Sequence, residues 1–308
     1  MDVVIPTFNG QQSLERAIAS AVAVPCVHRV IVVDDGSDPP AETALGRFAK
    51  DERLRVIVQA NAGTARARNR GLDATSAEHV VLLDTDDTFR PEIAIAIELA
   101  RRTGAPLTIG GRVSRRPDGL HIERRPPADW LRGDGRAGSA PSDWGFVPEA
   151  GDVLRPRPIL MFAGSGLIIS RRALDAGLRF DSAFKHTEDR DFCRRAADLG
   201  RIAVSSELLV DYYERDDGGN QSGYKHIHGI TRDFLLMISR HYEPRFRHHW
   251  EDAAAHRARC FSKFGTDAVL WRELLGQMRS RGLQVPLKAR LRWVARRALR
   301  SARVSATR

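Results

Sequence analysis

The sequence predicts an α/β fold, with a mostly parallel β-sheet flanked by helices and a helical region at the C-terminus. Over the first hundred residues, short apolar runs alternate with segments whose apolar residues recur at helical spacing. Each apolar run ends in polar or acidic residues. Strands that alternate with helices form right-handed βαβ units, and ligands bind at the carboxyl ends of such strands. Past Gly223 the apolar spacing is helical throughout.

The first two strands are expected within residues 2–9 and at 29–33. Pro6 ends the first of them, because proline cannot donate to the ladder of hydrogen bonds. The helix between the two strands carries apolar residues at helical spacing, namely Leu14, Ile18, Ala21 and Val22. The second strand ends in Asp34 and Asp35, which a Gly-Ser turn follows.

A third strand is expected at residues 54–58, followed by a loop at 61–64 and a helix that carries Arg68 and Asn69. A fourth buried strand covers residues 80–83. Because parallel strands end at the same edge of a sheet, we expect the loops that follow them to form one site. These loops begin at Pro6, Asp34, Gly63 and Asp84.

Three carboxylates follow the fourth strand, at Asp84, Asp86 and Asp87. In an extended chain alternate residues point to the same side, so Asp84 and Asp86 would reach one point. Adjacent carboxylates raise each other's pKa unless a cation lies between them. Mg²⁺ or Mn²⁺, which prefer oxygen ligands and often share substrate phosphates, would suit this position. The alternative is an acidic turn that caps a helix starting within residues 88–92.

Composition and charge narrow the class of protein. The 308 residues are 42% hydrophobic, and the three cysteines lie far apart with no metal-ligand spacing, which favours a reducing compartment. No apolar run of 18 residues occurs and Met1 leads directly into a strand, so we expect a cytoplasmic protein without a signal peptide or transmembrane helix. The whole net charge of +10 lies in residues 274–308, which contain ten Lys or Arg and no Asp or Glu. The body shows no interleaved basic and aromatic pattern, so no nucleic-acid partner is expected.

Five motifs in order resemble the conserved segments of family-2 glycosyltransferases with the GT-A fold. They are IPTFN at residues 5–9, VDDGS at 33–37, NAGTARARNRG at 61–71, LLDTDD at 82–87 and HTEDRDF at 186–192. The likeness also includes residues 164–172 and extends to about residue 215. It implies transfer of a sugar from a nucleotide-diphosphate donor to an acceptor, with inversion at the anomeric carbon.

The resemblance also assigns roles to single residues. It implies that Asp34 reads the base edge and that Arg68 lies near the base and diphosphate. The full nucleotide-sugar-binding set would be Pro6, Thr7, Asn9, Asp34, Gly63, Arg68, Asp84 and Thr85. Mn²⁺ or Mg²⁺ would be held by Asp84 and Asp86, with Asp87 as an auxiliary.

Glu188, Asp189 and Asp191 are the candidate catalytic carboxylates. A carboxylate within hydrogen-bond reach can take the proton of an acceptor hydroxyl as that hydroxyl attacks. The residues after them predict a helix with Glu188 and Asp189 in its first turn, where the helix dipole favours anions, so capping alone explains at least one of the three. Asp189 matches the family's general base, and Asp191 is the alternative.

Two segments of the second half are less regular. Residues 112–158 show little periodicity, and in the family this region lies on the acceptor side. Trp130 and Trp144 would therefore either stack on a sugar or pin the loop to the core. Residues 211–222 resemble the family's lid over the diphosphate. They lack the Gln-x-x-Arg-Trp motif of processive synthases, which favours transfer of a single sugar.

The tail predicts a basic amphipathic helix over residues 286–303. Leu287 and Leu291 begin an apolar face surrounded by Lys and Arg, and Trp293 is expected at its border, where an indole prefers a membrane interface. Such helices bind anionic membranes, where a lipid-linked glycan acceptor would be found. The alternative is a helix packed on the body through Leu287 and Leu291.

Taken together, the sequence predicts an inverting, metal-dependent glycosyltransferase of the hexosyltransferase type, with a UDP- or dTDP-linked donor and a hydroxyl acceptor. A GT-A domain at 1–222 would comprise a nucleotide-binding half (1–111) and an acceptor and catalytic half (112–222), followed by a helical region at 223–308. A sugar nucleotidyltransferase is one alternative, but its Gly-rich triphosphate loop and following lysine are absent near the N-terminus. A catalytically inactive scaffold or binding module is the other, and the intact acidic sets argue against it.

Overall fold

The computed structural model describes residues 1–133, 142–148, 150–154, 164–214 and 226–306. The chain divides into two compact units. An α/β unit comprises Met1–Val153, Arg157–Ala183 and Glu188–Asp216, and a helical unit comprises Leu154–Pro156, Phe184–Thr187 and Asp217–Arg308. The short segment Phe184–Thr187 thus belongs with the C-terminal helices, a feature that the expected boundary after residue 222 did not include.

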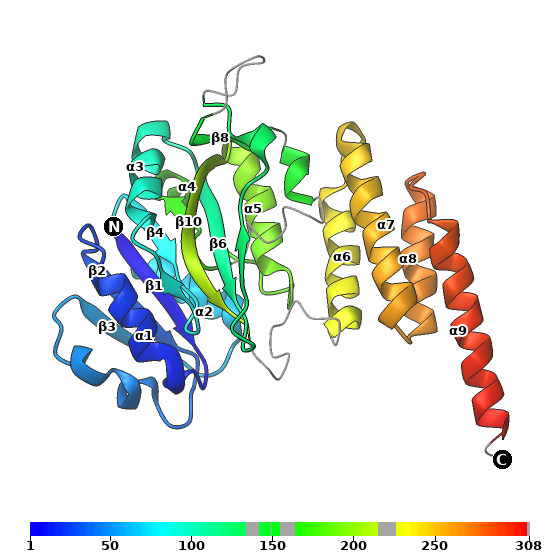
Figure 1. The fold of residues 1–308 in the computed structure, drawn as a ribbon, viewed down its shortest axis with the longest axis horizontal. Helices are drawn as coiled ribbons and strands as arrows, with labels where there is room; N and C mark the ends of the chain where they lie inside the picture. The colour runs from blue at the N-terminus through cyan, green and yellow to red at the C-terminus, as the bar shows by residue number, and fades with distance from the viewer. Residues whose placement is uncertain (134–141, 149, 155–163, 215–225, 307–308) are drawn as a thin grey trace. The chain divides into compact units, whose positions relative to one another are not determined.

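The α/β unit is built on a mixed sheet of ten strands (Figure 1). Its order is β3-β2-β1-β4-β9-β6-β10-β5, with β7 beside β6 and β8 beside β10. The strands are β1 Asp2–Thr7, β2 Arg29–Asp34, β3 Leu54–Val58, β4 His79–Leu82, β5 Thr88–Phe89, β6 Leu107–Arg115, β7 His121–Arg124, β8 Trp144–Phe146, β9 Ile168–Ser170 and β10 Ala203–Tyr213. Strands β1 to β4 pair in parallel, and β9 runs antiparallel to β4 and β6. The predicted α/β class and its parallel first half are confirmed.

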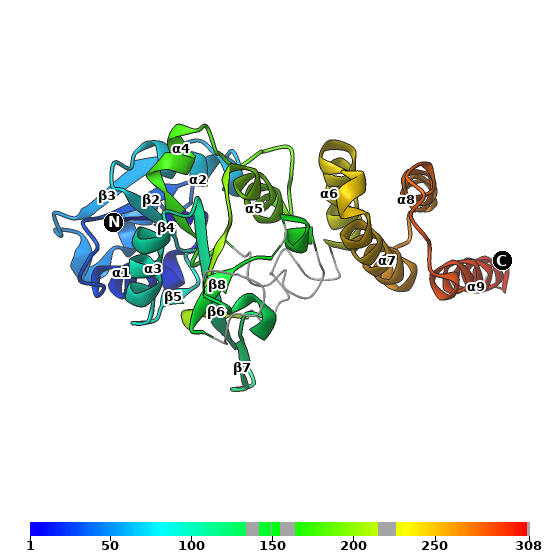
Figure 2. The same ribbon diagram turned by 90° about the horizontal axis from the view of Figure 1, so that it is seen from above.

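Helices cover both faces of this sheet (Figure 2). They are α1 Gln11–Val22, α2 Thr64–Asp73, α3 Ile93–Thr103, α4 Arg171–Asp175 and α5 Glu188–Leu199. Successive residues of a strand point to opposite faces, so Val3 and Ile5 of β1 lie in one core while Val4 lies in the other. Leu14 of α1 packs in the first core and Leu72 of α2 in the second.

The acidic segment after β4 forms a turn and does not continue the strand. β4 ends at Leu82, and the N–H of Asp87 donates to the carbonyl of Asp84 at 3.0 Å. Strand β5 follows, and α3 begins at Ile93. The prediction that strand alternation aligns Asp84 with Asp86 was wrong, because the backbone turns between them.

Much of the region expected to be irregular is ordered by strands. β6 and β7 form an antiparallel hairpin, and β8 pairs with β10. Trp130 is 2% exposed and lies in the core, so it pins its loop rather than offering a face to a sugar. Trp144 is partly buried, with the Arg102 guanidinium 4.6 Å from its ring centroid. The described residues do not include 134–141, 149 and 155–163. Of the lid expected at 211–222, residues 215–222 also lie outside them.

The described part of the helical unit contains four long helices, namely α6 Ile227–His241, α7 Arg247–Phe264, α8 Ala268–Ser280 and α9 Leu287–Ala306. Trp293 of α9 is 8% exposed and stacks on Trp271 with ring centroids 5.1 Å apart. One detail of each prediction for this helix was wrong. Trp293 is a core residue and not a border residue, and Leu287 and Leu291 are exposed and do not pack on the body. Membrane association itself stays a prediction. In the described part of the chain, no helix is long and apolar enough to cross a membrane.

Candidate active site

The loops after β1, β2, β3 and β4 meet at one edge of the sheet, as the sequence predicts. The N–H of Asp35 donates to the carbonyl of Thr7 at 2.8 Å and joins the second loop to the first. The N–H of Gly63, whose φ is 90°, donates to the Asp35 carboxylate at 2.8 Å and adds the third loop. The hydroxyl of Thr85 donates to the carbonyl of Pro6 at 2.6 Å and adds the fourth.

Asn9 joins the first two loops through both its backbone and its side chain. Its backbone is left-handed, with φ of 53°, a conformation that asparagine tolerates better than most residues. Its N–H donates to the Ser37 hydroxyl and its side-chain oxygen accepts from the N–H of Asp38, each at 2.9 Å. Thr7 beside it is 4% exposed, and its hydroxyl is buried without a hydrogen-bond partner in the part of the chain that the structure describes.

Asp34 is fully buried, and its carboxylate accepts hydrogen bonds from its own loop. One carboxylate oxygen accepts from the N–H of Ser37 at 2.9 Å, and the other accepts from the N–H of Ala41 at 2.8 Å. The carboxylate is therefore turned inward, and base reading by Asp34 stays a prediction from the resemblance. Asp35, 3% exposed, is engaged in the same way by the loop after β3.

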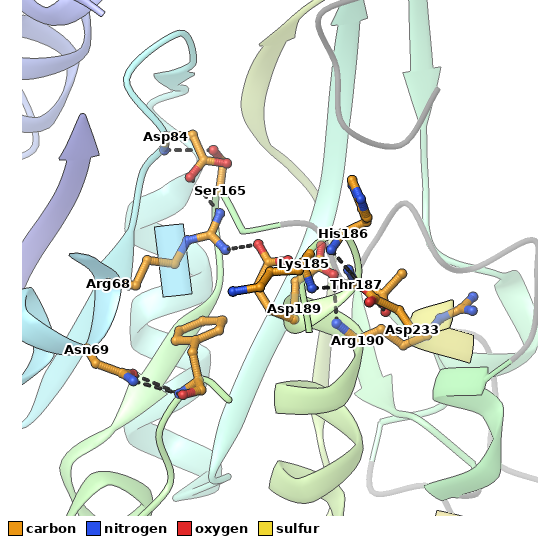
Figure 3. A network of polar contacts seen from close by, with 12 residues as sticks. Arg68, Asn69, Asp84, Ser165, Lys185, His186, Thr187, Asp189, Arg190 and Asp233 are labelled. Carbon is orange, nitrogen blue, oxygen red and sulfur yellow. Dashed lines mark hydrogen bonds and ion pairs between the residues drawn. The ribbon is translucent and has the colours of Figure 1, made fainter. Parts of the chain in front are cut away.

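Arg68 bridges the acidic turn and the start of α5 (Figure 3). Its Nη2 donates to Asp84 and its Nη1 to Glu188, each at 2.8 Å. The side chain is almost fully buried, so Arg68 is not a solvated arginine on a helix surface. Burial alone would lower the pKa of Arg68, but Asp84 and Glu188 raise it well above its usual value, so the guanidinium stays charged. Asn69, the next residue, pairs with both backbone groups of Phe180 at 2.8 Å.

Gly164 and Ser165 complete this bridge, and their roles were not predicted. A Cβ on Gly164 would clash with Nη2 of Arg68, so a larger residue would displace the guanidinium from its present position. The Ser165 hydroxyl accepts from the N–H of Asp84 at 2.9 Å and donates to the Asp87 carboxylate. Glycine and serine are common in loops, so the only signal was their position at the start of a motif-bearing segment.

Asp84, Asp86 and Asp87 belong to the turn that follows β4. Burial raises the pKa of Asp87 well above its usual value, and repulsion from Asp84 and Asp86 raises it further. A divalent cation beside the turn would relieve this repulsion. Within the described ranges, no group of three or more His, Cys, Asp or Glu is placed to hold a metal ion. The residues fit an ion held by one or two carboxylates that completes its coordination with substrate phosphates, as Mg²⁺ commonly does.

The three candidate catalytic carboxylates lie in the first turn of α5 and differ in their surroundings. Glu188 is held by Arg68, and Asp191 is 1% exposed and accepts from Arg195 at 2.6 Å. These contacts favour Asp189 over Asp191 as the predicted base. Asp189 remains partly exposed and accepts from the N–H of Arg190 at 2.7 Å. Dense packing around it, together with the charge of Glu188, raises the pKa of Asp189 to about 7, near the value that suits a general base.

Within the helical unit, Asp233 of α6 anchors the segment that leads into α5 (Figure 3). Asp233 is 4% exposed, and one of its oxygens accepts the backbone N–H groups of Lys185, His186 and Thr187 at 3.0, 2.7 and 3.0 Å. Thr187 is bonded to Glu188, so this carboxylate fixes the backbone two residues before Asp189. Nothing in the sequence indicated the contact, because Asp233 lies in an ordinary helical pattern 46 positions from Thr187.

Known proteins resemble this chain in sequence. A model of the family described as glycosyl transferase family 2 matches residues 2–178. The succinoglycan biosynthesis protein ExoO of Rhizobium meliloti (strain 1021) is 35% identical over 108 residues, which are 34% of this chain and 31% of that protein. The putative teichuronic acid biosynthesis glycosyltransferase TuaG of Bacillus subtilis (strain 168) is 30% identical over 95 residues, 30% of this chain and 38% of that protein. The aligned part spans about a third of the length of these relatives.

Solved structures resemble the chain over most of its length. S. aureus TarS 1-349 in complex with UDP-GlcNAc has a TM-score of 0.62 at 18% identity, covering 94% of this chain and 82% of that one. The complex of the same protein with UDP has a TM-score of 0.62 at 17% identity, covering 91% and 80%. At this level of identity the likeness supports the fold.

Proposed function

Because the chain belongs to glycosyl transferase family 2, we propose that it transfers a single sugar, with inversion, from a UDP- or dTDP-linked donor to a hydroxyl acceptor. The observation that carries the proposal is the Arg68 bridge, since one buried guanidinium joins the acidic turn to the helix that begins with the candidate base. The bound UDP and UDP-GlcNAc of the TarS structures favour a UDP-linked donor.

In this proposal the donor lies across the loops after β1 to β4, with Pro6, Thr7, Asn9, Gly63, Arg68 and Thr85 in or behind the nucleotide site. Asp84 and Asp86 would hold Mn²⁺ or Mg²⁺, and Asp87 would support their turn from behind. The ion, when bound, supplies positive charge that stabilises the leaving diphosphate.

Asp189 would act as the general base. Its carboxylate takes the proton of the acceptor hydroxyl while the hydroxyl oxygen forms a bond to the anomeric carbon. The bond from that carbon to the diphosphate breaks, and the nucleoside diphosphate leaves with the electron pair. A pKa of about 7 suits this role, because an appreciable fraction of Asp189 is ionised at neutral pH while remaining basic enough to accept the proton.

The acceptor would be a growing polysaccharide. Relatives named for succinoglycan and teichuronic acid biosynthesis favour this class of acceptor.

The function is tested by measuring release of the nucleoside diphosphate from a panel of nucleotide sugars, with Mn²⁺ and with EDTA. We expect slow metal-dependent hydrolysis of one or two UDP- or dTDP-sugars, and a rise in melting temperature only with donor and metal together. A nucleotidyltransferase would instead release pyrophosphate from UTP and a sugar 1-phosphate. A protein that binds the donors but neither hydrolyses nor transfers them would be the inactive scaffold.

The proposal includes a cytoplasmic enzyme at an anionic membrane surface. Leu287, Leu291 and Val294 of α9 are 63%, 61% and 64% exposed and recur at helical spacing, while the opposite side of the helix packs in the core. Lys288 and Arg290 beside them are exposed. The helix contains basic residues and no acidic residue, so its charge complements an anionic bilayer. Each cation near such a surface contributes about 1 kcal/mol of binding free energy.

This location is tested by co-sedimentation with vesicles that contain anionic lipids. Replacing both Leu291 and Val294 with Glu should abolish binding without loss of the core, because neither side chain packs inside. Replacing the exposed Val269 of α8 with Glu is the matched control. Binding that is equal with neutral vesicles, or unchanged by the double substitution, contradicts the membrane role.

A further inference from the structure

Arg112 and Arg124 form a pair of like charges within the α/β unit. They are directly opposed in the antiparallel register of β6 and β7. Arg112 is 8% exposed and Arg124 is half-buried. Like charges opposed across two strands destabilise a sheet, so the fold itself gains nothing from this arrangement.

The second feature of this pair is its lack of hydrogen-bonded or ion-paired anions among the described residues. The Nε atoms of Arg112 and Arg124 are buried and make no hydrogen bond to any residue that the structure describes. No ion pair to either side chain occurs among the residues that the structure describes, although most neighbouring arginines have carboxylate partners. Burying a cation without a paired anion is unfavourable, and an anionic ligand would remove that cost.

The surroundings of Arg112 connect this pair to the candidate active site. Its guanidinium lies 4.1 Å from the centroid of the Tyr212 ring on β10, which fixes its orientation. Burial lowers the pKa of Arg112 and Arg124 lowers it further, whereas Tyr212, Asp87 and Asp189 oppose the change. The cation is therefore within electrostatic reach of both the acidic turn and the candidate base.

We propose that Arg112 and Arg124 bind an anionic group, a phosphate or a carboxylate, carried by the acceptor glycan. This inference rests on the proposed function and deepens it by naming the class of acceptor. The two arginines lie in the second half of the α/β unit, after the four strands whose loops form the candidate nucleotide site. Two guanidinium groups offer planar sets of donors that match the oxygens of such anions.

The test uses the full chain with UDP and Mn²⁺ present. Binding of glucuronate and of glucose 6-phosphate is compared with binding of neutral glucose by calorimetry, for the parent, Arg112→Gln and Arg124→Gln. Arg125→Gln is the control, because Arg125 lies on the same hairpin but is exposed and paired with Glu123.

We expect the parent to prefer at least one anionic sugar over glucose. Each of the two variants should lose roughly tenfold or more of that affinity, the amount expected for one charge-assisted hydrogen bond, while the affinity for UDP stays within about twofold. Melting temperatures should hold or rise, because an unpaired buried cation is removed. If the two arginines only stabilised the fold, their substitution would lower the melting temperature.

Several results would overturn the assignment. If both variants lose UDP affinity as strongly, the pair serves the donor diphosphate and not the acceptor. If neither anionic sugar binds the parent better than glucose, or if the variants bind as the parent does, no anion site exists here. Donor hydrolysis measured in parallel separates this failure from failure of the proposed function, because hydrolysis needs no acceptor.

Discussion

Arg68 and Glu188 lie 120 positions apart in the sequence and form a buried salt bridge, with Nη1 and Oε1 at 2.8 Å. The same guanidinium binds Asp84, so it sets the distance between the acidic turn and the first residue of α5. Asp189 follows Glu188 directly. The bridge therefore couples the position of the proposed metal ligands to that of the proposed base.

Replacing Arg68 with Met should destabilise the protein and abolish transfer. The substitution leaves Glu188 buried without its cation, and breaking such a pair costs about 3–5 kcal/mol, with a discount here for the partly exposed Asp84. Chemical denaturation at neutral pH measures the loss. Arg70→Met, at an exposed position of the same helix, is the control and should change stability little. Equal effects of the two substitutions would show that the bridge contributes nothing.

Asp86→Ala should abolish metal-dependent donor binding without unfolding the protein. Removing a charge that repels Asp87 relieves strain in the turn, so the melting temperature should hold or rise slightly. Calorimetric titration of UDP with and without Mn²⁺ measures the first effect. A variant that binds UDP and Mn²⁺ like the parent would remove Asp86 from the proposed metal site.

The order of elements could be predicted well because it depends on local pattern. The apolar runs that became β1 to β4 and the spacing that became α1 and α2 each report on a single segment. Convergence of the loops then followed from the topology of parallel strands. The direction of Asp34 could not be read in this way, because its orientation depends on backbone N–H groups of a loop that the pattern does not specify.

Contacts between distant segments could not be predicted from the sequence. Gly164 makes room for Arg68 across 96 positions, and its residue type alone does not reveal a neighbour. The indole of Trp293 illustrates the same limit, since helical spacing shows which residues share a face but not which face meets the core. The basic, alanine-rich tail buries Ala289 and Trp293, whereas its aliphatic residues Leu287, Leu291 and Val294 are exposed.

Asp189→Asn should slow transfer by roughly a hundredfold or more while leaving the affinity for the donor near normal, as expected for loss of a general base. In the parent, the rate should rise with pH through about 7 because Asp189 must be ionised to accept the proton. The variant should lack this rise. Steady-state transfer measured between pH 5 and 9 tests both points, and a variant within a few-fold of the parent would exclude Asp189 as the base.

The raised pKa of Asp189 also predicts a pH-dependent change in stability. Its pKa is about 7 in the folded protein against 3.8 for the usual group, so the folded state holds this proton more tightly. The resulting stabilisation is complete below pH about 4 and is lost as pH rises through about 7. Asp189→Asn should therefore gain more in melting temperature over the parent at pH 8 than at pH 5. Asp175→Asn, at an exposed position of α4, should show no such difference.

Asp233→Asn should lower turnover more than it lowers donor affinity. An amide oxygen accepts the three N–H groups of Lys185, His186 and Thr187 less strongly than a carboxylate, with an expected loss of about 1–3 kcal/mol in stability. The backbone before Glu188 then loosens, and Asp189 is held less firmly over the acceptor. We expect kcat to fall several-fold and the apparent pKa of the pH profile to shift, with the Kd for UDP unchanged. Asp252→Asn, exposed on α7, is the control. If the melting temperature falls while kcat and the pH profile stay the same, Asp233 stabilises the helical unit and does not position the base.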